Sequence, residues 1–135
     1  MLMDEQPDSA KNREGAADRL QAARAKTIAT ITAIESELAA MHSAADGSNG
    51  DDEHDAEGST IAFERAQAKS LLDHATNHLA EINDALVRAE SGEYGQCERC
   101  ARMISSARLA ALPSTRFCVT CADLRQRQSG QASNR

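Results

Sequence analysis

The four cysteines of this 135-residue chain form two Cys-x-x-Cys pairs in its last third. The first pair is Cys97 and Cys100, and the second, seventeen residues further on, is Cys118 and Cys121. Each Cys-x-x-Cys turn directs two thiolates at one metal ion, and two such turns complete a tetrahedral site. The spacing lies within the range of structural zinc sites. The sequence therefore predicts one structural zinc ion bound by these four residues.

Two disulfides or a thioredoxin-like redox pair are the alternatives to zinc. The N-terminal residues MLMDEQPDSAKN contain neither the basic start nor the apolar run of a signal peptide, and no stretch is apolar enough to span a bilayer. We therefore expect a soluble, cytoplasmic protein, in which disulfides are disfavoured. A redox pair would need a βαβ setting, which is absent. Four protein ligands leave no position for a catalytic water, so the metal is expected to stabilise a small module.

Two heptad patterns precede the cysteines. Each predicts a helix of about 30 residues with a narrow apolar seam. Ser59 is expected to cap the second helix, and Gly92 is expected to end it. The first seam comprises Leu20, Arg24, Thr27, Ile31, Ile34, Leu38, Met41 and Ala45, and the second comprises Ile61, Arg65, Ala68, Leu72, Ala75, Leu79, Ile82, Leu86 and Ala89.

Two such helices, joined by a loop of about a dozen residues, are expected to fold back as an antiparallel hairpin with arms of roughly 45 Å. Dimerisation through the same faces is the alternative, and we expect a monomer. The predicted fold is mainly α. Its parts are a flexible segment 1–16, a coiled-coil hairpin 17–91 with a tip loop 46–58, a four-cysteine zinc finger 92–128 with a short closing helix, and a flexible tail 129–135.

Charge is divided unevenly along the chain. Residues 1–95 contain 8 Lys and Arg against 19 Asp and Glu, whereas residues 96–135 contain 7 Arg against 2 acids. Six of the acids lie between Asp46 and Glu57, in the predicted tip loop. An acidic half does not suit wrapping of a nucleic-acid backbone, so sequence-specific DNA binding is not expected. The asymmetry points instead to protein partners.

One run of residues around the cysteines is more specific than their spacing. It reads Gly92-Glu-Tyr94-Gly95-Gln-Cys97-x-x-Cys100, then Ile104, then Arg108-Leu109-Ala-Ala111-Leu-Pro113, then Cys118-x-x-Cys121. This run resembles the DksA/TraR C4-type zinc finger family, and the preceding hairpin with its acidic tip resembles the coiled coil of the same family. Ala101 stands where the family usually has glycine, which suggests a slightly different turn.

The resemblance implies a bacterial transcription regulator, not an enzyme, that binds RNA polymerase. Members of the family insert the coiled coil into the secondary channel of the polymerase, with acidic tip residues near the active centre. By resemblance, these residues are Asp51, Asp52, Asp55 and Glu57. The best-known tip signature is Asp-x-x-Asp-x-Ala, whereas this chain has Glu57 at the alanine position.

Alarmone-responsive members of the family carry basic residues at two positions of the finger. This chain has Leu112 and Ala122 there, so tight binding of guanosine tetraphosphate is not expected. Two further hypotheses are a thiol-based redox sensor, in which oxidation ejects the zinc, and a coiled-coil module for another protein partner. No membrane partner is expected. His74 and His78 have the i, i+4 spacing of a metal pair, but no carboxylate motif accompanies them.

Overall fold

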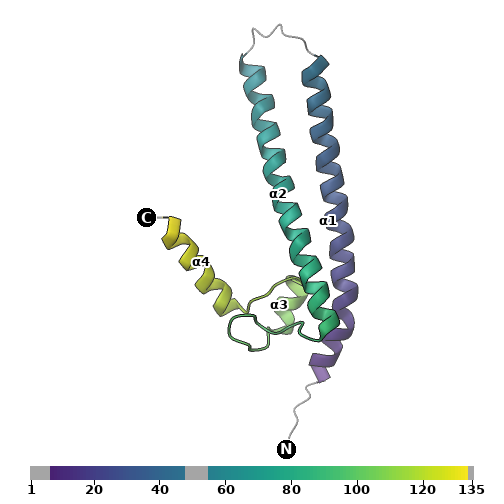
Figure 1. The fold of residues 1–135 in the computed structure, drawn as a ribbon, viewed down its shortest axis with the longest axis vertical. Helices are drawn as coiled ribbons and strands as arrows, with labels where there is room; N and C mark the ends of the chain where they lie inside the picture. Colours follow the sequence, from purple (N-terminus) through teal and green to yellow (C-terminus); the bar gives the residue numbers. More distant parts are fainter. Residues whose placement is uncertain (1–6, 48–54, 134–135) are drawn as a thin grey trace, which may run out of the picture. The chain divides into compact units, whose positions relative to one another are not determined.

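The computed structural model describes residues 7–47 and 55–133. Four helices follow one another, α1 (Pro7–Gly47), α2 (Asp55–Ser91), α3 (Ser106–Ala111) and α4 (Val119–Ser133) (Figure 1). Within the described ranges there is no strand, only one isolated antiparallel bridge between Gln96 and Met103. The predicted mainly α fold is confirmed, with its helical hairpin, four-cysteine finger and closing helix. Among these residues no helix has the length and apolar character needed to cross a membrane.

The chain divides into two compact units, and α1 and α2 contribute to both. The first, here called the finger unit, contains the described residues up to Arg24 and those from Glu81 onward. The second, here called the hairpin unit, lies between Ala25 and Ala80.

In the hairpin unit, α1 and α2 run antiparallel (Figure 1). The residues that are buried there are small, namely Thr27, Ala68 and Ala75. The larger apolar residues of the predicted seam are only half-buried, and Ile61 is 43% exposed. Small side chains let two helices approach closely, but they remove little apolar surface from water. The half-buried group comprises Ile31, Ile34, Leu38, Met41, Leu72 and Leu79.

The finger unit has a denser core. Leu20 of α1 and Ile82 of α2 are fully buried, and they belong to the same cluster as residues of the finger. Beside them, the polar seam residue Arg24 donates from Nε to Asn83 Oδ1 over 3.0 Å. This contact is exposed and joins the two helices at the edge of their seam. The finger residues in the cluster are Tyr94, Cys97, Ile104, Leu109 and Cys121.

Helix boundaries differ from those predicted. Helix α1 (Pro7–Gly47) includes residues of the segment 1–16 that was predicted to be flexible, and proline is tolerated in the first turn of a helix. Helix α4 continues to Ser133, into the predicted flexible tail 129–135, which contains no proline to stop it.

The predicted tip loop 46–58 is also too long. Helix α1 extends to Gly47, and α2 begins at Asp55, so the predicted cap Ser59 lies inside the helix. Residues 48–54 lie outside the described residues.

Candidate metal centre

The segment that leads to the first cysteine starts at Gly92, which ends α2 as predicted. Its φ of +81° is a left-handed conformation that glycine adopts without strain. The backbone N–H groups of Glu93 and Tyr94 then both donate to the carbonyl oxygen of Arg88, over 2.9 and 3.1 Å. These bonds satisfy a carbonyl that the helix itself leaves open. They turn the chain from α2 toward Cys97.

The first cysteine pair lies in a tight turn closed by backbone hydrogen bonds. Cys97 N–H donates to the carbonyl of Arg102 over 2.8 Å, and Ala101 N–H donates to the carbonyl of Cys97 over 3.0 Å. Ala101 has a φ of +65°, so it takes the left-handed backbone that the family's usual glycine favours. That conformation costs a residue with a Cβ roughly 1–2 kcal/mol.

The second cysteine pair is positioned by α3 and by the start of α4. The Ser105 side chain accepts a hydrogen bond from Arg108 N–H and caps α3. The Tyr94 hydroxyl donates to the carbonyl of Pro113 over 2.7 Å, which fixes the chain after α3. Cys118 then directly precedes α4, and Cys121 lies in the first turn of that helix.

The four thiols form one cluster. Their sulfur atoms all lie within 4.8 Å of one another, and those of Cys100 and Cys118 are 3.9 Å apart. Zinc–sulfur bonds of about 2.3 Å place the ligands of a tetrahedral site about 3.8 Å apart. Cys97 and Cys121 are buried, Cys118 is half-buried and Cys100 is exposed. Both the spacing and the all-sulfur donor set therefore suit zinc.

The environment of the cluster favours thiolate at some positions more than at others. Burial raises the pKa of Cys97, but backbone hydrogen bonds from Cys100, Cys118 and Arg99 outweigh this effect and lower the pKa to about 6. A backbone hydrogen bond from Cys121 lowers the pKa of Cys118. Burial raises the pKa of Cys121 to about 12. Metal binding therefore has to displace a proton from Cys121.

The other residues singled out in the sequence lie away from this cluster in the chain. Asp55 and Glu57 are in the first turn of α2, whereas Asp51 and Asp52 lie outside the described residues. Nothing in the structure tests the role of these four acids, so it stays a prediction. His74 and His78 are exposed on α2. In the part of the chain that the structure describes, the four cysteines are the group with metal-binding geometry.

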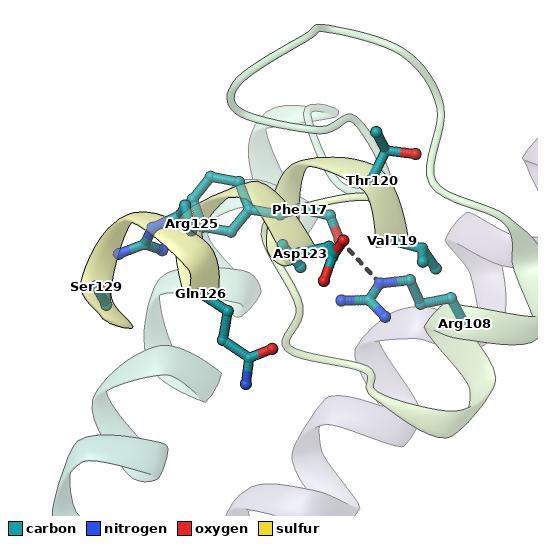
Figure 2. Close-up of a pocket in the computed structure, with 9 residues that line it drawn as sticks. Arg108, Phe117, Val119, Thr120, Asp123, Arg125, Gln126 and Ser129 are labelled. Atoms are coloured by element: carbon teal, nitrogen blue, oxygen red, sulfur yellow. Dashed lines mark hydrogen bonds between the residues drawn. The ribbon is translucent and has the colours of Figure 1, made fainter. Parts of the chain in front are cut away.

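A shallow groove between α3 and α4 was not predicted (Figure 2). Arg108 at one side donates from Nε to the carbonyl oxygen of Phe117 over 2.9 Å. Arg125 on α4 stacks its guanidinium over the Phe117 ring, 4.6 Å from the ring centre. The sequence contained one indication of this groove, because Arg108 belongs to the run of residues that resembles the DksA/TraR finger. The lining residues are Arg108, Phe117, Val119, Thr120, Ala122, Asp123, Arg125, Gln126 and Ser129.

Comparison with known families identifies the finger. Residues 92–127 match the family model of the prokaryotic DksA/TraR C4-type zinc finger. This match confirms the resemblance seen in the sequence. Together with the thiol geometry, it supports one structural zinc ion.

Comparison with individual proteins extends beyond the finger. The chain is 46% identical over 66 residues to an uncharacterized protein of Aquifex aeolicus, covering 46% of this chain and 46% of that protein. It is 35% identical over 72 residues to general stress protein 16O of Bacillus subtilis, covering 53% and 44%. The chain thus spans less than half the length of each relative.

Among solved structures, the fold is similar to that of transcription factor DksA2 from Pseudomonas aeruginosa. The TM-score is 0.73 at 24% sequence identity, with 92% of this chain and 93% of the other covered. The likeness therefore extends from the finger over both long helices, as a likeness of fold.

Proposed function

We propose that this chain, with a DksA/TraR-type zinc finger at residues 92–127, is a cytoplasmic bacterial transcription regulator that binds RNA polymerase. In this proposal the hairpin enters the secondary channel of the polymerase, and its acidic tip acts near the active centre. The observation that carries the proposal is the likeness of fold to a transcription factor over 92% of the chain. The finger alone would leave the role of the two long helices unexplained.

The zinc ion has a structural role in this proposal, with Cys97, Cys100, Cys118 and Cys121 as its ligands. Four sulfur ligands fill a tetrahedral site, and zinc so bound supplies folding free energy to a small module. Nothing in the site calls for an enzymatic reaction, so we assign none. The metal holds the finger in shape, and the finger residues form one core with the ends of α1 and α2.

Charge supports different contacts for the acidic residues 46–57 and for the arginine-containing finger. The acids around Asp52 and Asp55 suit the basic residues and metal ions of a polymerase active centre, because opposite charges attract strongly where water is scarce. Among the arginines after residue 95, Arg99 and Arg102 are exposed, and they suit an acidic protein surface. Leu112 is 51% exposed but has no cationic group, and neither has Ala122. We therefore propose that the protein acts without tight binding of guanosine tetraphosphate, and we propose separately that it is a monomer.

The experiment that tests the tip is an open-complex lifetime assay with purified RNA polymerase from the same host. Asp52→Asn combined with Asp55→Asn removes two tip charges and should abolish the effect of the protein on open-complex lifetime. Affinity for polymerase should change less than about threefold, because this proposal assigns most of the binding energy to contacts of the finger and of the helix arms, and assigns to the tip the effect on the active centre.

A matched control removes two acids from α2 outside the tip, by Glu64→Gln and Asp73→Asn. Both side chains are exposed in the hairpin unit. This control should keep the full effect on lifetime. If the control and the tip variant behave alike, net charge rather than the tip explains the activity, and this part of the proposal is wrong.

A further inference from the structure

Four charged residues connect both cysteine turns of the finger unit to α2. They form a chain of ion pairs in the order Asp84, Arg116, Glu98, Arg88, here called the ion-pair network. Asp84 and Arg88 are one helical turn apart on α2. Glu98 lies inside the first Cys-x-x-Cys turn, and Arg116 is two residues before Cys118. The two cysteine turns thus each contribute one member.

Two of the three contacts share one carboxylate oxygen, that of Glu98. Glu98 Oε1 lies 3.9 Å from Arg88 Nε and 4.0 Å from Arg116 Nε. Arg116 also pairs through Nη2 with Asp84 Oδ2. The backbone N–H of Glu98 donates to the carbonyl of Arg116 over 2.9 Å, so the two cysteine turns are fixed to each other beside α2.

Arg88 is the member of this network whose pairing matters most for stability. Its side chain is only 11% exposed, and none of its three guanidinium nitrogens has a hydrogen-bond partner among the described residues. A buried charge is costly unless it is paired. Glu98, on the first cysteine turn, is the acid that faces it. The Asp84–Arg116 pair is more exposed, and pairs of that kind contribute little on their own.

We propose that the ion-pair network couples zinc occupancy to the order of the last two turns of α2, residues 84–91. Zinc holds the two cysteine turns together, and this places Glu98 between the two arginines. When zinc leaves, Glu98 is no longer held against Arg88, and the guanidinium reaches water only if the end of α2 opens. If zinc binding favours the formed ion-pair network, then the formed network favours zinc binding to the same extent. A substitution that destabilises the formed network should therefore lower the affinity for zinc. The inference rests on the zinc assignment and is independent of polymerase binding.

The first test is hydrogen exchange of the full chain with zinc and after chelation. Chelation should raise the exchange rates of residues 84–91 by about tenfold or more, since these amides would exchange through local opening. Unchanged protection of 84–91 after zinc removal would overturn the proposal.

The second test separates coupling from general loss of the finger, by measuring zinc affinity in competition with a chromophoric chelator. In the zinc-bound state, Glu98→Gln leaves Arg88 buried without a charge partner, whereas in the zinc-free state Arg88 can reach water. The substitution therefore penalises only the zinc-bound state, and zinc affinity should fall about fivefold, within the usual range of coupling energies. The control Arg99→Gln changes one charge in the same cysteine turn, at an exposed residue outside the network. It should stay within about twofold of the original, as surface substitutions usually do.

The decisive variant combines Glu98→Gln with Arg88→Met. Removing both partners also removes the unpaired buried charge, and replacing a buried ion pair by an apolar side chain is often neutral. Zinc affinity should therefore return most of the way to that of the unchanged chain. If Glu98→Gln binds zinc as tightly as Arg99→Gln, or if Arg88→Met fails to restore affinity, the network does not couple the two sites.

Discussion

The finger unit and the hairpin unit are built on the same two helices, but they bury different side chains. In the finger unit, Leu20 and Ile82 are fully buried and share a core with two of the cysteines. Among the residues of the hairpin unit whose burial the structure describes, one threonine and two alanines are buried, while most isoleucine and leucine side chains of the seam are half-exposed. Apolar burial stabilises by about 25 cal/mol per Å². We infer that most of the stability comes from the finger unit, which contains the metal site. In the hairpin unit, α1 and α2 are held together by much less buried apolar surface.

The largest expected effect comes from removing the metal site. Cys121→Ala, or chelation of zinc from the unchanged chain, should remove most of the roughly 10 kcal/mol or more that structural zinc contributes to the folding of small modules. The finger unit should then lose its protection against hydrogen exchange, while helical backbone in the hairpin unit persists. Exchange measured by mass spectrometry checks this. Equal loss of protection in both units would show that the hairpin unit has no stability of its own.

A pair of core substitutions tests the difference in burial. Ile82→Ala removes a fully buried side chain from the finger unit and should destabilise the protein by about 3 kcal/mol. Ile34→Ala removes the same atoms from a half-buried position in the hairpin unit and should cost about 1 kcal/mol. Urea denaturation followed by circular dichroism gives both values. Similar losses at the two sites would contradict the proposed concentration of stability.

The smallest effect concerns the turn after the second cysteine. Ala101→Gly should relieve the left-handed strain and stabilise the zinc-loaded protein by about 1 kcal/mol or less, because the gain is partly offset by greater freedom of the unfolded chain. Ala107→Gly, in the helical backbone of α3, should instead destabilise it by about 1 kcal/mol. Thermal unfolding measures both changes. Destabilisation by Ala101→Gly would mean that the φ of Ala101 carries no strain.

Local chemistry explains which features could be predicted from the sequence. The cysteine spacing predicted the cluster, the heptads predicted the paired helices, and Gly92 ended α2 as expected. Ser59 is not the cap, because α2 begins four residues earlier, at Asp55.

The ion-pair network could not be predicted, for a different reason. Asp84 and Arg116 are 32 residues apart, and the finger has to fold before they meet. No sequence pattern indicates that a charged residue on a helix will pair with a charged residue in a distant loop. The tip acids differ from the network in this respect. The sequence identifies them clearly, but their role depends on a partner protein and cannot be seen in this chain alone.

Direct binding to RNA polymerase is the measurement that tests the proposed function most directly. The zinc-loaded protein, immobilised at low salt, should bind polymerase of its own host saturably, and the affinity should fall as salt rises. The tip variant Asp52→Asn with Asp55→Asn should bind almost as well, while the metal-free protein should bind much more weakly. If the zinc-loaded chain shows no affinity for polymerase at low salt, the proposed function is wrong.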